Sequence, residues 1–347
     1  MLPQQNLIRE AQFYPGQFGV PGSDVSRGLR TIPRSSVWYV DYGHPMASDN
    51  NDGTDPDNPL STVQAAVNRI NSTTYGNTYD TILVRRMGEE SVQTGVYGTA
   101  PSSVRIIGVG GPRSPYGVYW EGVDGSYCLD VRAPGWYVSG FRFGPGVAGT
   151  AIRLPMTGAA GVDASSIPIF FTAENCIFYG ANAAAGDGLY GIDMYGGAYW
   201  PVVRNCIFEF FSRANAAAIA VTDSSFALPY RPIIENCLFR ENVGHIDCVI
   251  GANRGFNSGM IRNCVFSGRA GQPGASYTNQ VTGKAIDLTG GTGNHVVGNY
   301  FGGTYRSAGN GDYDAGTNDF WIGNYANPAT AFAGTVGDNG LTILPPA

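Results

Sequence analysis

The sequence repeats one four-residue motif: NCIF at Asn175–Phe178, NCIF at Asn205–Phe208, NCLF at Asn236–Phe239 and NCVF at Asn263–Phe266. Successive copies begin 30, 31 and 27 residues apart. Weaker copies flank the series: GFRF from Gly140, GNYF from Gly298 and GNY from Gly323. A motif that returns once per turn of the chain, with variable insertions between copies, is typical of a solenoid. The irregular spacing argues against leucine-rich and ankyrin repeats.

A second motif precedes each copy of the first. It reads CLDV from Cys128, AIRL from Ala151, GIDM from Gly191, AIAV from Ala218, HIDC from His245 and AIDL from Ala285. Because side chains alternate between the two faces of a strand, its second and fourth residues should point inward and its third outward. Two motifs per coil over at least six coils predict an all-β fold, a single solenoid of stacked parallel strands.

The NCxF motif predicts which residues of successive coils lie above one another. Its asparagine is expected at a turn, where the amide can bond the backbone and its copies in adjacent coils. The predicted ladder is Asn175, Asn205, Asn236, Asn263 and Asn299. The cysteine and phenylalanine should face inward, giving stacks of Cys176, Cys206, Cys237 and Cys264, and of Phe143, Phe178, Phe208, Phe239, Phe266 and Phe301. The cysteines could form disulfides or bind a metal, but we favour small core fillers in reducing surroundings.

The residue before each asparagine alternates in charge. The series is Glu174, Arg204, Glu235 and Arg262. If the coils align on the asparagines, each charge meets its opposite on the next coil. We interpret this pattern as packing between coils and not as a binding site.

The segment WYVDYGHPMASDNNDGTDPDNPLSTVQAAVNRI from Trp38 to Ile70 resembles the entry segment of pectate-lyase-like right-handed parallel β-helix proteins. Similar proteins are common among tailed bacteriophages, as spikes, fibres and capsid decorations. Ser61 or Thr62 can begin an amphipathic helix that caps the open end of the solenoid and buries Val63, Ala66, Val67 and Ile70. Its acidic loop, Asp49, Asp52, Asp55 and Asp57, could bind calcium, although a solvated turn is favoured.

We divide the chain into an extended N-terminal arm (1–36), an entry segment with the capping helix (37–100), the coils (101–325) and a C-terminal tail (326–347). The arm contains FYPGQFGVPG and has no periodicity, so it cannot form a core of its own. Phe13, Tyr14 and Phe18 are therefore candidate anchors on a partner. Disorder is the alternative for both ends.

Composition excludes several functions. The 347 residues carry a formal net charge of −6 with 14% charged residues, which argues against nucleic acid or an anionic membrane as the main partner. We expect no signal peptide and no membrane span. The six cysteines include no CxxC pair, and we expect neither a metal site nor a cofactor.

Catalysis has one weak candidate. Asp247 and Asp287 are outward residues of adjacent coils, about 5 Å apart at strand spacing, near the separation of a retaining glycosidase pair. Every vertical neighbour in such a stack is that close, so we expect no confident catalytic residue. Eight aromatic residues in the insertions could line a sugar groove or a subunit interface, and we favour the interface: Tyr190, Tyr195, Tyr199, Trp200, Phe210, Phe211, Phe226 and Tyr230.

Two functions remain. The resemblance to phage proteins, the arm and the low charge favour a structural virion protein made in the host cytoplasm, a homotrimeric β-helix that binds other virion proteins through its arm. The alternative is a depolymerase, a polysaccharide lyase or glycoside hydrolase that acts on a surface glycan. The fold alone cannot separate them.

Overall fold

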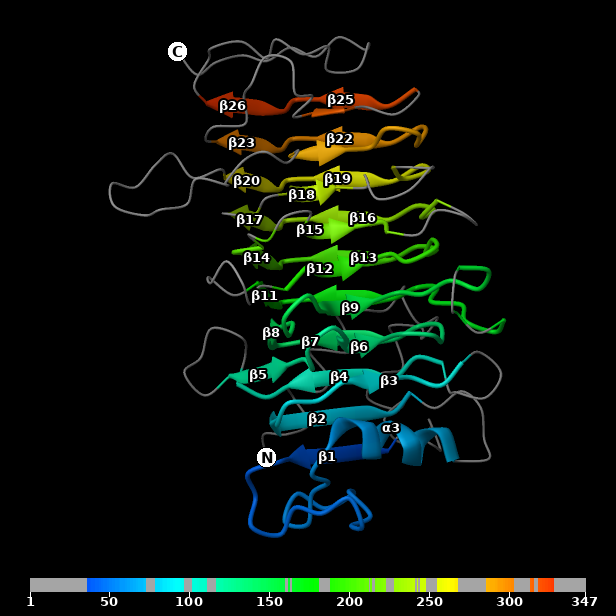
Figure 1. Cartoon of the computed structure of the whole chain (residues 1–347), viewed down its shortest axis with the longest axis vertical. Helices are drawn as coiled ribbons and strands as arrows, with labels where there is room; N and C mark the ends of the chain where they lie inside the picture. The colour runs from blue at the N-terminus through cyan, green and yellow to red at the C-terminus, as the bar shows by residue number, and fades with distance from the viewer. Residues whose placement is uncertain are drawn as a thin grey trace, which may run out of the picture.

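The computed structural model describes residues 36–72, 79–96, 102–110, 117–159, 162, 164–180, 188–211, 213, 216–222, 228–240, 242, 244–247, 255–267, 285–302, 313–314 and 318–327. These residues form a right-handed parallel β-helix, whose coils stack along one axis with the N-terminal strand at one end (Figure 1). All strand pairs are parallel, and α3 (Val63–Ser72) is the one α-helix of the described chain. No helix in these ranges is long and apolar enough to cross a membrane.

The strands form three parallel sheets, called A, B and C. From β3 onward, each coil passes through sheet B, then sheet A, then sheet C. Sheet A contains β1 (Val37–Asp41), β2 (Thr81–Arg86), β4 (Arg105–Gly108), β7 (Tyr137–Ser139), β10 (Thr172–Glu174), β13 (Val202–Arg204), β16 (Ile233–Glu235), β19 (Met260–Arg262), β22 (His295–Val297) and β25 (Phe320–Ile322). Sheet B contains β3 (Val92–Gln93), β6 (Tyr127–Asp130), β9 (Thr150–Arg153), β12 (Tyr190–Asp193), β15 (Ala217–Ala220), β18 (Gly244–Asp247), β21 (Ile286–Asp287) and β24 (Tyr313–Asp314). Sheet C contains β5 (Val118–Glu121), β8 (Phe141–Gly144), β11 (Ile177–Tyr179), β14 (Ile207–Glu209), β17 (Leu238–Arg240), β20 (Val265–Ser267), β23 (Tyr300–Gly302) and β26 (Tyr325–Asn327).

The core consists of like side chains stacked coil upon coil. Phe143, Phe178, Phe208, Phe239, Phe266 and Phe301 form one stack, with successive ring centroids 5.2, 4.5, 4.9, 4.8 and 4.9 Å apart. Burying each ring contributes about 1.5–3 kcal/mol. The stacked cysteines are buried and free, and each thiol lies near a backbone carbonyl, as for Cys206 and the Ala173 oxygen at 3.7 Å. The described cysteines are therefore core fillers, as predicted.

A single left-handed residue turns the chain from sheet A into sheet C. Asn175, Asn205, Asn236 and Asn263 lie one above another there, with φ between 52° and 55°. Asparagine is among the few residues other than glycine that tolerate this conformation. The four residues are exposed, and Asn205 Nδ2 donates a hydrogen bond to Glu174 Oε1 of the preceding coil at 3.4 Å.

Asn299 does not continue this ladder, so its assignment was wrong. Tyr300 pairs with Val265, which places Asn299 level with Cys264 and gives the corner to Gly298, with φ 64°. Asn299 points into the core, where its Oδ1 accepts a hydrogen bond from the Cys264 amide at 2.9 Å. Its Nδ2 donates to Asn324 Oδ1 at 2.9 Å. The inner cysteine stack therefore ends in a buried amide ladder.

The helix α3 lies at the N-terminal end of the solenoid, as predicted (Figure 1). Thr62 begins it, because its Oγ1 accepts a hydrogen bond from the Ala65 amide at 3.1 Å. The buried residues are those predicted, Val63, Ala66, Val67 and Ile70. The Glu90 carboxylate accepts hydrogen bonds from the amides of Val63 and Gln64 at 3.1 and 2.7 Å. The Glu90 side chain thus joins the N-terminus of the capping helix to the first coil.

Candidate functional site

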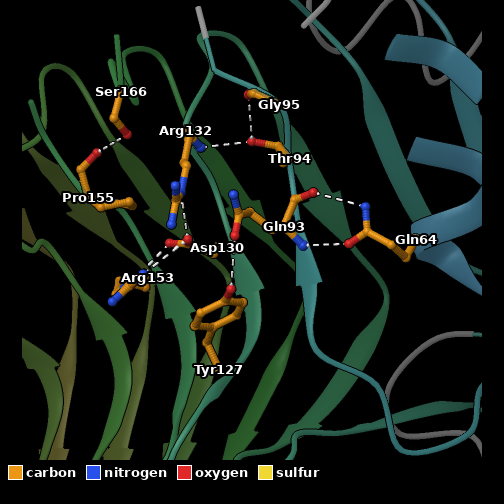
Figure 2. A network of polar contacts seen from close by, with 10 residues as sticks. All are labelled: Gln64, Gln93, Thr94, Gly95, Tyr127, Asp130, Arg132, Arg153, Pro155 and Ser166. Atoms are coloured by element: carbon orange, nitrogen blue, oxygen red, sulfur yellow. Dashed lines mark hydrogen bonds and ion pairs between the residues drawn. The ribbon is translucent and has the colours of Figure 1, made fainter. Parts of the chain in front are cut away.

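The densest polar cluster surrounds Asp130, at the end of β6 on the outward face of sheet B (Figure 2). Asp130 is fully buried although it points away from the core. Its Oδ2 lies 2.8 Å from Nε of Arg132, and its Oδ1 lies 2.9 Å from Nε of Arg153 on the next coil. Arg153 Nη2 donates a further hydrogen bond to Oδ2 at 3.1 Å. Asp130 is therefore held by two arginines, one of them bidentate.

Two tyrosines hold Arg153 from both sides. Its guanidinium lies 5.0 Å from the Tyr127 ring centroid and 5.5 Å from that of Tyr195, within the range of cation–π attraction. Partial burial opposes the charge of Arg153, but the hydrogen bonds and charge of Asp130 outweigh it and raise the pKa of Arg153. Burial also raises the pKa of Tyr127. At neutral pH the arginine stays charged and the phenol stays protonated.

The cluster continues to the capping helix. The Tyr127 hydroxyl donates a hydrogen bond to Gln93 Oε1 at 3.2 Å (Figure 2). The backbone N–H of Gln93 donates a hydrogen bond to Gln64 Oε1 at 2.8 Å. Gln64 Nε2 in turn donates to the backbone carbonyl oxygen of Gln93 at 3.1 Å. This chain of contacts joins helix α3 to two coils. The charge of Asp130 is balanced by Arg132 and Arg153, and the carboxylate serves the structure. It could act as a base or a metal ligand only if these ion pairs broke.

Ion pairs also join neighbouring coils elsewhere on sheets A and C. Arg204 Nη2 lies 3.1 Å from Glu174 Oε2. Arg262 Nε donates to Glu235 Oε2 at 2.8 Å, and Arg240 Nε donates to Glu209 Oε2 at 2.7 Å on sheet C. In each pair, as between Asp130 and Arg153, the carboxylate belongs to the coil nearer the N-terminus and the arginine to the following coil. The predicted charge alternation is confirmed for Glu174–Arg204 and Glu235–Arg262.

The candidate pair Asp247 and Asp287 lies in direct register on β18 and β21. Asp314 on β24 extends the column by one coil. Asp287 is fully buried, and its Oδ1 accepts a hydrogen bond from the Thr289 amide at 2.9 Å. The side chains of Asp247 and Asp314 lie outside the described residues. The backbone thus brings three aspartates into one column.

The acidic loop of the entry segment uses its carboxylates locally. Asp49 Oδ1 accepts hydrogen bonds from the amides of Ser61 and Thr62 at 3.0 and 2.9 Å, just before helix α3. Asp52 and Asp55 bond amides two residues ahead, which is the geometry of turns. The Thr54 bonds lower the pKa of Asp52. No group of three or more metal-ligating side chains occurs within the described ranges.

The predicted partner residues have different outcomes. Phe13, Tyr14, Phe18 and Phe226 lie outside the described residues. Phe211 is buried in the core. Tyr199, Trp200 and Tyr230 do meet, where the chain enters sheet A: their ring centroids lie 5.7 to 6.2 Å apart.

Sequence reasoning missed the burial of Asp130 and the role of Arg132. The outward residues of CLDV and AIRL have opposite charges, which could have indicated the contact with Arg153. Arg132 follows the motif, in a loop whose path the repeat does not predict. Phe170 was also missed: its ring stacks on Trp200 at 5.2 Å, and it lies outside both motifs.

Neither a family model nor a curated protein matches the sequence. Among solved structures, pectate lyase Pel9A is 13% identical, with a TM-score of 0.56 over 86% of this chain and 70% of that chain. The chain has the pectate-lyase-like parallel β-helix fold. An alginate lyase from Paenibacillus sp. str. FPU-7 is 15% identical, with a TM-score of 0.45 over 75% of this chain and 84% of that chain. The ORF18 protein of Geobacillus virus E2 is 13% identical, with a TM-score of 0.44 over 89% and 60%. At these identities the likeness concerns the fold alone.

Proposed function

We propose that this β-helix is a structural virion protein of a tailed bacteriophage, a spike, fibre or capsid decoration that acts as a stiff rod. One observation carries the proposal: four carboxylates that point outward from the coils are each paired with an arginine of the next coil. The charges thereby fasten the coils along the axis of the solenoid. A rod that transmits force or carries other virion proteins needs firm contacts between its coils. It does not need reactive side chains.

The entry segment from Trp38 to Ile70 and the arm add support. The segment resembles phage β-helix proteins, and the arm offers Phe13, Tyr14 and Phe18 outside any repeat. Ordering such residues costs about 1–2 kcal/mol each in backbone entropy. A neighbouring virion protein that buries the three rings would offset this cost.

The test is assembly with and without the arm. The full chain should purify with phage particles at a fixed copy number, and a variant that lacks Met1–Pro33 should fold normally by circular dichroism but be absent from particles. Chain found only in the unassembled fraction would refute the virion role. Particle binding that survives the deletion would refute the role of the arm.

The alternative is a polysaccharide depolymerase, and the column Asp247, Asp287 and Asp314 favours it. Carboxylates on neighbouring coils can act as acid and base on a glycosidic bond. If the chain is a depolymerase, purified protein should shorten host surface polysaccharide, and Asp287→Asn should abolish the activity in a variant that circular dichroism shows to be folded. Glu235→Gln, which removes a carboxylate of sheet A, is the matched control.

A further inference from the structure

The outward face of sheet A carries a column of partly exposed apolar residues. Val202, Ile233 and Met260 occupy the same position on β13, β16 and β19. Further along the face, Phe320 and Ile322 on β25 are 39% and 53% exposed. A line of apolar side chains on a surface is a candidate for contact with another molecule.

Strained aromatic residues border this column. Phe170 and Trp200 have φ values of 56° and 51°, where bulky residues are rare, and Gly135, Arg231 and Ser258 hold the same position in other coils. The two rings stack 5.2 Å apart at 18°, so each covers one face of the other. Phe170 still remains 46% exposed.

A charged column borders the other side. Glu174, Arg204, Glu235 and Arg262 follow one another on consecutive strands, in the order negative, positive, negative, positive. Reversing this order gives the complementary pattern. A copy of the face turned end over end therefore offers an opposite charge at every level.

We propose that sheet A binds a second copy of this chain, antiparallel, about a two-fold axis that passes between β13 and β16. The axis lies in the interface, across the strand stack. It places these residues opposite one another: Glu174 and Arg262, Arg204 and Glu235, Trp200 and Arg231, Val202 and Ile233, Ile107 and Ile322, Arg105 and Phe320. Every charge of the column meets its opposite, and exposed Ile322 meets an aliphatic residue. This inference does not rest on the virion role, and it proposes a dimer in place of the trimer that we expected from the sequence.

A second copy fits because the same solenoid repeats at the same spacing. Eight strands, β4 to β25, would overlap, which is about 38 Å at 4.8 Å per strand. Five residue steps across the face give about 17 Å, so each copy would bury about 650 Å² and the pair about 1,300 Å². This total is at the lower end for specific interfaces, so we take a micromolar dissociation constant as the range to test. A parallel pair centred on Val202 would instead place Glu174 against Phe170 and Arg262 against Ser258.

Sedimentation of the full chain from 1 to about 100 µM tests the pairing, because this range brackets a micromolar dissociation constant. We expect a monomer–dimer equilibrium that Ile233→Arg weakens at least about tenfold, since this side chain lies next to the axis. The double exchange Glu235→Arg with Arg262→Glu should weaken it as well, because like charges then meet. Circular dichroism must show that both variants fold. A monomer at all concentrations, a trimer, or a dimer indifferent to either folded variant would overturn the proposal.

Spin labels on sheet C test the orientation. Tyr119 and Val265 are exposed members of one outward column, on β5 and β20. In the antiparallel dimer, labels at Tyr119→Cys should be separated along the axis by about 34 Å and labels at Val265→Cys by about 14 Å, from the strand spacing. Equal distances at the two sites would indicate a parallel pair and overturn the proposal.

Discussion

Asp130→Asn tests whether the polar cluster on sheet B stabilises the fold. The substitution keeps the shape of the side chain and removes the negative charge that holds Arg132 and Arg153. The side chain of Arg132 is only 11% exposed and that of Arg153 is 27% exposed, so neither guanidinium regains full hydration. Leaving a buried charge without its partner costs about 3–5 kcal/mol. We expect a loss of about 3 kcal/mol, since Arg153 can turn partly to water.

The assay is equilibrium unfolding in urea, followed by circular dichroism and by tryptophan fluorescence. Coincident curves with an unchanged slope would show that unfolding is two-state and that one free energy of unfolding describes each variant. Repeat proteins can unfold in stages, so both probes are required. Glu235→Gln is the matched control, because it breaks a pair of the same chemistry whose arginine, Arg262, is 46% exposed. It should cost less than about 1 kcal/mol. If the two variants lose the same free energy, burial does not decide the strength of these pairs and the reasoning fails.

Three further outcomes are expected. Phe208→Ala opens a cavity in the middle of the phenylalanine stack and should lower the free energy of unfolding by about 3–5 kcal/mol in urea; a loss below 1 kcal/mol would contradict the packing. All six cysteines should react as free thiols after denaturation without reductant, whereas burial raises the pKa of Cys128 and should keep it unreactive in the native protein at pH 8; fewer than six thiols would indicate a disulfide. Burial raises the pKa of Glu90 despite the amides of Val63 and Gln64, so this group stabilises the fold below its unfolded pKa and loses that contribution as the pH rises through its folded pKa; Glu90→Gln should flatten this part of the pH profile, and an unchanged profile would contradict the assignment.

The sequence predicts the coils well because the fold repeats a local constraint. Each NCxF motif contains one residue for a left-handed turn and two for the core. Aligning the copies of the motif in the sequence therefore also gives the register of the strands in neighbouring coils. The assignment of Asn299 failed because it matched asparagines rather than positions. Phe301 stacks on Phe266, and counting back from it places Asn299 level with Cys264. The corner requires a left-handed conformation, which glycine meets as well as asparagine.

The site was harder to predict because it depends on contacts outside the repeat. The motif places Asp130 on the outward face of its strand. Outward side chains of a β-helix are usually exposed to solvent. Arg132 changes that, since it follows the motif and folds back over the carboxylate. The same limit applies to the column of Asp247 and Asp287: strand register is predictable, whereas the cover over an outward side chain comes from insertions of unrelated length.

The residues at the two ends of the strands in sheet A differ in kind. Its three-residue strands are bounded at both ends by left-handed residues, such as Trp200 before β13 and Asn205 after it. At the corner with sheet C the position is filled by residues that tolerate the conformation, asparagine and glycine. At the opposite end two consecutive coils use Phe170 and Trp200 instead, which the backbone does not favour. Ser103, Arg231 and Ser258 hold the same left-handed position in other coils, so the backbone accepts several kinds of side chain there. Two bulky rings on consecutive coils nevertheless place apolar surface beside the exposed column of sheet A, and this is why that face is the one we expect to be covered.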